Sequence, residues 1–380
     1  MADAVVAEYL LARPPSEAAR AARLLAVEQT VEVPESLIPP DIEARVVGKV
    51  LSVEPAGEGA SRARVSYDAA LSGWELPRLL NLLYGNVSLQ SGIRLEGVEL
   101  PASFLGRFKG PNFGGAGLRR LTGVAGRPLL ATALKPNGAP VEEFARLASD
   151  FVRAGGDVVK DDQNLCDADR AAFETRVRRV QDAVSEANAK TGRGALYCPI
   201  LCGPADDLEA RVEVVQRCGA KGVLAPPLLL GLDAVRWLAE DFGLVVLAHP
   251  SFTGTFFSDP RHGVSPGVLL GTLFRLAGCD ASIFPNPGGR FGFSKAACLD
   301  LAERLRGPLG TLAPALPAPA GGMTFESLPG MADDYGPESM FLIGGGLLAH
   351  SPSVYDGTKA FLDALRERFA ERLSAPELVS

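Results

Sequence analysis

The chain has 380 residues, with 38 basic and 45 acidic side chains and a formal net charge of −7. This length allows two domains, or one large domain with an appendage, and the mildly acidic balance without a basic patch excludes nucleic acid as an expected partner. No basic and apolar leader opens the chain and no apolar run is long enough to cross a bilayer, so we expect a soluble cytoplasmic protein without a membrane partner.

The first part of the chain mixes strand and helix patterns. Apolar spacing of three and four residues predicts a helix over 76–85, and runs with strand character lie within 5–12, 43–54 and 61–68. A glycine-rich segment, FKGPNFGGAGL at 108–118, then has the composition of a connector. We therefore expect an N-terminal α+β domain over residues 1–120.

Eight short apolar runs follow, and amphipathic helical patterns separate them. The runs occupy residues 128–136, 157–163, 195–203, 222–230, 244–251, 281–287, 310–319 and 339–346. Continuous apolar strands are typical of a parallel sheet that is buried on both faces, and eight strand–helix units in about 240 residues match the size of a (β/α)8 barrel. An open doubly wound sheet is less favoured, because no GxGxxG motif follows the first run. The predicted fold class is α/β, with a C-terminal (β/α)8 TIM barrel over residues 121–380.

Charged residues stand where the first two of these strands end. Lys135 ends the first run, and Lys160, Asp161 and Asp162 end the second. In barrel enzymes the carboxyl ends of the strands face the active site, so two lysines at neighbouring ends indicate proton transfer or anion binding rather than a surface ion pair. Each ammonium should lower the pKa of the other lysine, while the aspartates should raise both, which leaves the net direction open.

Four further strand ends carry residues of interest. His249 ends the fifth run, where an acid–base group and a hydrogen-bonded core histidine are equally good interpretations. Arg290 lies in the loop after the sixth run, and two glycine clusters follow the seventh and eighth. Backbone N–H groups without a Cβ can approach phosphate oxygens, and barrel phosphate sites are common at these two ends. The predicted phosphate-binding glycines are Gly321, Gly322, Gly344, Gly345 and Gly346.

Five motifs carry a resemblance to a known family. FKGPNFG is followed by GRPLLATALKP, and GGDVVKDDQN, PAGGM and IGGGLLAH come after it in the chain. In this order they resemble the RuBisCO-like proteins, the non-carboxylating type IV branch of the RuBisCO large-chain family. The resemblance implies that Lys135 moves protons during enolisation, that Lys160 can become carbamylated, and that both glycine turns bind phosphate.

The resemblance also implies a metal ion and a partner subunit. Lys160, Asp162 and Gln163 fall on the family's Mg²⁺ ligands, the first of them as a carbamate. Glu28 and Asn86 match residues that reach the active site of a neighbouring subunit, which implies a homodimer with shared active sites.

Two departures from the family pattern limit these expectations. Gln163 replaces a glutamate, and because Mg²⁺ prefers anionic oxygens, the site is either metal-free with an unmodified Lys160 or weakened. The loop after the sixth run reads NPGGRFGF, with Arg290 and without a lysine to steer a CO2-derived carboxylate. We therefore expect proton abstraction from a phosphorylated sugar, without CO2 fixation.

Several reactions of the family fit such a site. The best candidate is 5-methylthioribulose 1-phosphate isomerase of methylthioadenosine salvage, because the apolar Phe284 and Pro285 suit a methylthio tail. A 2,3-diketo-5-methylthiopentyl 1-phosphate enolase is less favoured, because no lysine closely follows Asn86. A decarboxylase or transcarboxylase of 3-oxo-isoapionate 4-phosphate, and a non-catalytic scaffold or sensor, complete the range of functions. The expected roles are a base at Lys160 or Asp161, an acid–base partner at Lys135, and carbonyl-polarising groups at His249 and Asn86.

Overall fold

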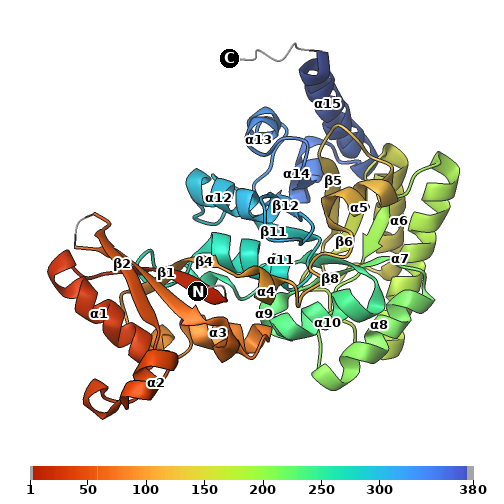
Figure 1. Ribbon diagram of the computed structural model, residues 1–380. Coiled ribbons are helices and arrows are strands. Elements are labelled where there is room, and N and C mark those ends of the chain that lie inside the picture. Colours follow the sequence, from red (N-terminus) through yellow and green to blue (C-terminus); the bar gives the residue numbers. More distant parts are fainter. Residues whose placement is uncertain (1–2, 58, 375–380) are drawn as a thin grey trace. The chain divides into compact units, whose positions relative to one another are not determined.

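The computed structural model of the protein describes residues 3–57 and 59–374, which form two compact units (Figure 1). Within those residues, the first unit takes up the chain to Lys109 together with 252–273 and 308–312. The second unit takes up 110–251, 274–307 and the chain from Ala313 onward. The expected boundary at residue 120 thus lies inside the second unit, because the expected connector is partly a helix that belongs to the barrel.

A five-stranded sheet is the frame of the first unit. Its strand order is β10-β4-β1-β3-β2, in which β10 pairs with β4 in parallel and the other neighbours are antiparallel. In β1 every second residue is buried, as the alternation of side chains along a strand requires. The strands are β1 (Ala4–Leu11), β2 (Lys49–Pro55), β3 (Ser61–Asp68), β4 (Ile93–Glu99) and β10 (Gly263–Val264).

Helix α1 (Pro15–Glu28) packs against β2 and β3 of this sheet. Three of its buried residues are alanines, Ala18, Ala22 and Ala26, whose small side chains allow a close approach to the strands. The other helical segments of the unit are η1 (Glu35–Leu37), α2 (Pro40–Arg45), η2 (Ala69–Ser72), α3 (Leu76–Tyr84), η3 (Asn86–Leu89), α4 (Ala102–Leu105), η5 (Gly254–Phe256) and the π-helix η6 (Gly267–Leu273).

Eight parallel strands form the barrel of the second unit. Their order is β7-β6-β5-β13-β12-β11-β9-β8, and a bridge between Ile200 and Leu224 joins the two ends of this row. The predicted (β/α)8 barrel is therefore confirmed. The strands are β5 (Leu129–Leu134), β6 (Val158–Asp161), β7 (Leu196–Cys198), β8 (Gly222–Ala225), β9 (Val245–Ala248), β11 (Ala281–Pro285), β12 (Leu316–Ala320) and β13 (Met340–Leu342).

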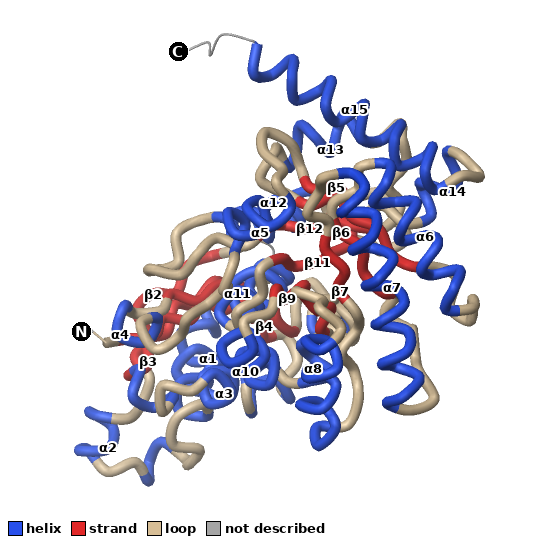
Figure 2. The backbone as a smooth tube through the Cα atoms, turned by 90° about the vertical axis from the view of Figure 1, so that its right-hand side faces the viewer, coloured by secondary structure: helices blue, strands red, loops and turns tan. Residues whose placement is uncertain are grey.

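Helices surround these strands, and Figure 2 shows α6 and α7 side by side next to β5 and β6. Helix α7 begins where the Asp169 side chain accepts a 2.8 Å hydrogen bond from the Ala172 N–H, and it ends at the left-handed Gly192. No helix in the described part of the chain is both long and apolar enough to cross a membrane. The helices of the unit are α5 (Gly114–Thr122), α6 (Val141–Ala154), α7 (Arg170–Thr191), η4 (Ala205–Asp207), α8 (Leu208–Arg217), α9 (Pro227–Leu230), α10 (Leu232–Phe242), α11 (Phe274–Leu276), α12 (Lys295–Arg306), α13 (Leu328–Tyr335), α14 (Gly345–His350) and α15 (Val354–Ser374).

All eight barrel strands are shorter than the apolar runs that predicted them, and β8 and β12 are two examples. β8 ends at Ala225, because Pro226 and Pro227 lack the N–H that a strand would need and lead into α9 instead. β12 begins only at Leu316, although the apolar run starts at residue 310. Apolar composition alone could not separate these strands from their flanking loops.

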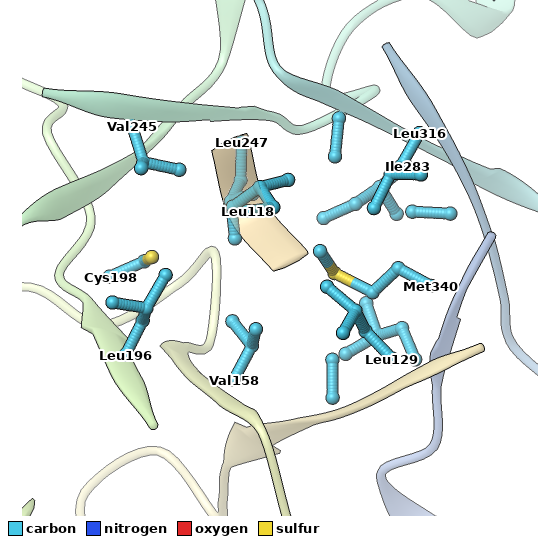
Figure 3. Packing of buried hydrophobic residues seen from close by; sticks show 14 of the residues in the cluster. Leu118, Leu129, Val158, Leu196, Cys198, Val245, Leu247, Ile283, Leu316 and Met340 are labelled. Atoms are coloured by element: carbon cyan, nitrogen blue, oxygen red, sulfur yellow. The ribbon is translucent and has the colours of Figure 1, made fainter. Parts of the chain in front are cut away.

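Apolar side chains fill the barrel interior, and one of them comes from α5. Leu118 lies among inward-facing residues of several strands, such as Val158 and Ile283 (Figure 3). The Asp280 carboxylate, at the amino end of β11, accepts hydrogen bonds from the N–H groups of Phe113 and Gly114 at 2.8 and 2.7 Å. These bonds place the start of α5 at the amino ends of the strands, which leaves the carboxyl ends for the polar residues.

Candidate active site

The alternation of side chains along β6 decides which of its polar residues face the barrel interior. Val158 belongs to the interior cluster, so Lys160 and Asp162 follow it on the same face. Asp161 points the other way, toward the helix layer. Both inward residues are buried, with 3% and 4% of their surface exposed.

Lys135 and Asp162 form an ion pair between the ends of two neighbouring strands. β5 and β6 are paired in parallel, and Lys135 Nζ lies 2.8 Å from Asp162 Oδ2. The N–H of Asn164 donates to the other carboxylate oxygen at 3.1 Å. Burial alone would raise the pKa of Asp162, but these two donors outweigh it and hold the pKa below its usual value. The expected convergence of the two lysine-bearing strand ends is thus present.

Lys160 is a buried amine with a strongly shifted pKa. Its Nζ donates to the backbone oxygen of Asp161 at 2.9 Å. Burial lowers the pKa of Lys160 to about 8, against the opposing charge of Asp162 and with the help of the Lys135 ammonium. An amine with this pKa is partly neutral near pH 7 and can accept a proton from carbon. The net direction that the sequence left open is therefore downward.

His249 belongs to the same electrostatic cluster. Its backbone N–H donates to Ala225 O at 2.8 Å, and its Nδ1 lies 2.7 Å from Ser251 Oγ. Burial, and then the charge of Lys160, lower the pKa of His249 to about 3, so the ring stays neutral at physiological pH. A neutral imidazole can polarise a carbonyl through a hydrogen bond, whereas it cannot supply the proton of an imidazolium.

Asp161 is not available as a base. Its carboxylate is fully buried and accepts hydrogen bonds from Arg176 Nη1, from the Tyr197 hydroxyl at 2.7 Å and from the Ile200 N–H at 2.8 Å. Arg176 also holds Asp167, in the loop after β6, through two bonds of 2.9 and 2.7 Å. Of the two bases expected from the sequence, this leaves Lys160 as the candidate.

Sequence reasoning missed Arg176 and Tyr197, which support the strand end from outside the barrel. The period of two along β6 was the available signal, because it turns Asp161 away from Lys160 and toward a helix. Arg176 itself is 3% exposed in its side chain and lies on α7, where a buried arginine signals a buried acidic partner.

The residues expected to bind Mg²⁺ supply an incomplete set of oxygens. One end of the Gln163 amide lies 3.3 Å from both carboxylate oxygens of Asp162. With nitrogen at that end the amide donates to the carboxylate, and with oxygen there the two residues converge as neighbouring ligands of a hard cation do. Lys160 carries no oxygen, and the described residues contain no group of three His, Cys, Asp or Glu side chains that could hold a metal. As unmodified side chains, these residues do not fit Mg²⁺.

Both glycine clusters present backbone N–H groups at the rim of the barrel. Gly321 and Gly322 follow β12 with φ angles of 78° and 68°, a left-handed conformation that favours glycine. Their N–H groups donate to no hydrogen bond within residues 3–57 and 59–374, and the same holds for the N–H groups of Gly345 and Gly346 at the start of α14. These groups can therefore bind the oxygens of an anion.

The glycine turns lie close to the strand that carries Lys135. β12, β13 and β5 are consecutive in the barrel. The Thr132 hydroxyl of β5 donates to Ile343 O at 2.8 Å, directly before the cluster that starts at Gly344. An anion at the glycine turns and a carbonyl at the lysines can thus belong to one small molecule.

Two predicted site residues belong to β11 and the loop that follows it. Arg290 is accessible to a ligand, whereas Phe284 is not. Arg290 is exposed, and its guanidinium stacks over the Phe291 ring at 5.4 Å, with no carboxylate partner among the described residues. Phe284 was expected near the substrate, but it is fully buried against Tyr335, at 5.9 Å between ring centroids. The alternation along β11 explains the error, because Ile283 faces the interior and Phe284 therefore faces the helices.

Glu28 and Asn86 meet each other in the first unit. Asn86 Nδ2 donates to Glu28 Oε1 at 3.1 Å, so the structure brings together these two residues from α1 and η3. Leu89 ends the same η3 segment and is 87% exposed, which is unusual for an apolar side chain of this size.

The chain is similar to several known proteins over nearly its whole length. A family profile for the ribulose bisphosphate carboxylase large chain, catalytic domain, matches residues 115–284. A 5-methylthioribulose-1-phosphate isomerase from Rhodospirillum rubrum is 38% identical over 95% of this chain and 96% of its own. A 2,3-diketo-5-methylthiopentyl-1-phosphate enolase from Geobacillus thermodenitrificans is 32% identical over 86% and 83%. The crystal structure of a Rubisco-like protein from Rhodopseudomonas palustris superposes with a TM-score of 0.87 at 36% identity, covering 97% of this chain and 99% of that one.

Proposed function

Because this chain belongs to the ribulose bisphosphate carboxylase large-chain family, as a RuBisCO-like protein, we propose that it is a non-carboxylating enzyme that isomerises a phosphorylated ketose. The observation that carries this proposal is the cluster of Lys135, Lys160, Asp162 and His249 at the carboxyl ends of the strands. The favoured substrate is 5-methylthioribulose 1-phosphate, since an isomerase of that compound is 38% identical to this chain.

Lys160 is the proposed base. Its pKa of about 8 gives a neutral fraction near neutral pH, and its position inside the barrel shields it from bulk water. In this proposal the amine takes a proton from the carbon next to the carbonyl, and the electron pair of that C–H bond moves onto the carbonyl oxygen. The former carbonyl oxygen is then protonated, and the hydroxyl on the carbon that lost its proton gives up its own O–H proton to become the new carbonyl. The Lys160 ammonium returns its proton to the former carbonyl carbon, which completes the isomerisation.

Lys135 and His249 are the proposed partners of the developing oxyanion. The Lys135 ammonium is oriented by Asp162 at 2.8 Å and can donate a hydrogen bond or a proton to the carbonyl oxygen. The neutral ring of His249 can donate a second hydrogen bond from Nε2 when its Nδ1 accepts from the Ser251 hydroxyl. A negative charge that forms beside these donors is stabilised without protein rearrangement.

The glycine turns and Arg290 are the proposed binding site of the phosphate. The N–H groups after β12 and at the start of α14 are directed at one anion in this proposal, and Arg290 adds a positive charge. This holds the phosphorylated end of the sugar at a fixed place on the rim, so the reacting carbons are oriented toward the two lysines.

Mg²⁺ enters the proposal only through a modified Lys160. A carbamate there would add the missing anionic oxygen to those of Asp162 and Gln163, and a bound Mg²⁺ would then polarise the carbonyl. The unmodified amine and this carbamate are mutually exclusive states of one residue, and the proposed base is the unmodified state.

We also propose that the protein is a homodimer with shared active sites. The pair of Glu28 and Asn86 supports this, since both match family residues that act in a neighbouring subunit and a 3.1 Å hydrogen bond joins Asn86 Nδ2 to Glu28 Oε1. The exposed Leu89 beside them would be buried by a partner.

The test is incubation with 5-methylthioribulose 1-phosphate in D2O, followed by NMR. Deuterium should enter the carbon next to the carbonyl, and an isomeric ketose phosphate should accumulate. A Lys160→Met variant, which keeps the volume of a buried side chain, serves as the matched control and should do neither. If the unmodified protein exchanges no carbon-bound proton, with or without Mg²⁺ and bicarbonate, the isomerase proposal is wrong.

A second candidate is the 2,3-diketo-5-methylthiopentyl 1-phosphate enolase, which a relative at 32% identity supports. It also begins with loss of a proton beside a carbonyl, so the same residues serve it. The segment after Asn86, VSLQSGIRLEG, contains no lysine, which counts against it. Offering the diketone in the same NMR experiment distinguishes the two reactions by their products.

A further inference from the structure

The loop that leads from β11 to α12 begins with a fixed turn. The sequence Asn286-Pro287-Gly288-Gly289 has proline and a left-handed glycine, at φ 76°, in its two central positions, as a type II turn requires. The Gly289 N–H donates back to Asn286 O at 3.3 Å. Asn286 is itself anchored, because its N–H donates to Ala320 O at 2.8 Å and its Oδ1 accepts from the Tyr335 hydroxyl at 3.0 Å.

This turn rests directly on the glycine turn after β12, backbone against backbone. A Cβ on Gly289 would lie 2.8 Å from the carbonyl oxygen of Gly321, and a Cβ on Gly322 would lie 2.7 Å from Gly289 Cα. Neither neighbour is the end of a flexible side chain, so neither can move aside cheaply. Gly289 does not have a left-handed φ, so the lack of space, rather than the backbone conformation, is what excludes a side chain there.

We propose that Gly289 is a positioning residue, whose contact with Gly321 and Gly322 sets Arg290 against the anion that the glycine turn binds. The inference rests on the proposed phosphate site and adds to it the residue that positions Arg290. Gly289 directly precedes Arg290 in the chain. The fixed turn therefore restricts the backbone conformations from which the Arg290 side chain can extend. Arg290 has an exposed guanidinium without a carboxylate partner in the described chain, so its charge is available to a ligand.

The glycine contact also explains why a mobile side chain can contribute. An arginine on an unconstrained loop spends most of its time away from any one anion, and ordering it costs conformational entropy. The contact of Gly289 with Gly321 and Gly322 fixes the backbone of both turns in the free protein. This reduces the entropy that is lost when the ligand binds. In this proposal, a shift of the turn by the width of a methyl group moves Arg290 out of reach of an anion that is bound by Gly321 and Gly322.

The experiment measures the dissociation constant of inorganic phosphate by calorimetry, using the full-length protein. Gly289→Ala should weaken phosphate binding about tenfold, and Arg290→Gln should weaken it by a similar factor, as expected for the loss of one charge-assisted contact. The double variant should bind no more weakly than Arg290→Gln alone, because the two changes remove the same contact. Gly292→Ala is the matched control: it lies in the same loop, has open space around it and no left-handed φ, and should bind like the parent.

Unchanged phosphate binding in Gly289→Ala, or additive losses in the double variant, would overturn the inference. If Gly289→Ala does not fold, hydrogen exchange on the unmodified protein replaces it. Phosphate should then slow exchange of the amides at 289–293 as well as those at 321–323, and protection confined to 321–323 contradicts the inference.

These readouts are independent of the reaction itself. Weaker phosphate binding in Gly289→Ala would support the inference even if the favoured ketose is not the substrate. In the converse outcome, the protein turns over that ketose while Gly289→Ala binds phosphate as tightly as the parent does. That result upholds the proposed function and refutes this inference alone.

Discussion

Lys160 is the residue whose surroundings do most to determine the chemistry. Burial removes water from its ammonium, and the pKa falls to about 8 even though the Asp162 carboxylate opposes that fall. Asp162 cannot restore the pKa in full, because its carboxylate is already bound to Lys135 at 2.8 Å. The ion pair thus fixes Lys135 beside the strand end, where its positive charge helps to lower the pKa of Lys160.

Replacing Lys135 by methionine should raise the pKa of Lys160. The change removes a positive charge that lowers this pKa and frees the Asp162 charge that raises it, so both effects have the same sign. NMR titration of protein with labelled lysine Cε can follow this, since the chain has only eight lysines. Lys295→Met is the control, because Lys295 pairs with Asp334 at an exposed position elsewhere on the unit. A Lys160 midpoint that stays at about 8 in Lys135→Met would refute the proposed coupling.

Replacing Gln163 by glutamate should strengthen Mg²⁺ binding. The variant adds an anionic oxygen 3.3 Å from those of Asp162, which gives a hard cation a second charged ligand. We expect a gain of about tenfold in affinity, with a larger gain when bicarbonate can modify Lys160. Competition with Mn²⁺, followed by electron paramagnetic resonance, measures it. Equal affinity in the parent and in Gln163→Glu would show that the glutamine is not what limits the site.

At the scale of elements, β6 depends on α7 for its geometry. Arg176 joins Asp161 at the strand end, Asp167 in the following loop and Tyr197 on β7. Arg176 and Asp161 are buried, and a buried charge is tolerated only while its partners are in place. Helix α7 therefore fixes the strand end that presents Lys160 and Asp162.

Arg176→Met should destabilise the protein by about 3–5 kcal/mol, because it leaves Asp161 as an unpaired buried carboxylate. Adding Asp161→Asn should recover part of the loss, since the remaining group is then neutral. Arg178→Met, which removes an exposed ion pair with Glu174 on the same helix, should destabilise the protein far less than Arg176→Met, because water already screens that pair. Urea unfolding measures all of these variants. A loss in Arg176→Met no greater than that in Arg178→Met would contradict the proposed role.

Patterns within one element were readable from the sequence, and contacts between elements were not. Apolar runs and helical spacing located all eight barrel strands, because parallel strands buried on both faces are apolar throughout. The two strand-end lysines and the glycine turns followed from the rule that barrel sites lie at the carboxyl ends. The partners of Asp161 could not be read, since Arg176 is brought to it by the packing of α7. Phe284 was misplaced because the position of a residue at a strand end does not give the face on which it lies.

At the scale of the whole molecule, the chain forms two units, and the proposed chemistry resides in the barrel. The first unit contributes the hydrogen-bonded pair of Glu28 and Asn86, which the proposed homodimer would bring to the active site of a second copy of the chain. In that proposal the small sheet and helix α1 present this pair to the partner.

Dilution should abolish turnover as dimers dissociate. The loss of activity should follow the loss of dimer measured by analytical ultracentrifugation over the same concentrations. Leu89→Glu should shift both curves to higher concentration by placing a charge in the proposed interface, whereas Leu229→Glu, at an exposed leucine of the second unit, should shift neither. Full turnover by a demonstrated monomer is the result that contradicts shared active sites.

The most direct test of the lysine chemistry is the rate of solvent hydrogen exchange into 5-methylthioribulose 1-phosphate as a function of pH. The working base is the neutral amine, so a folded pKa of about 8 predicts a rise of about fivefold from pH 7 to pH 8 and a plateau above pH 9. Lys160→Met should exchange at least about a hundredfold more slowly throughout this range. Exchange that is independent of pH between 7 and 9, or that proceeds at the parent rate in Lys160→Met, would show that the proton leaves by another route.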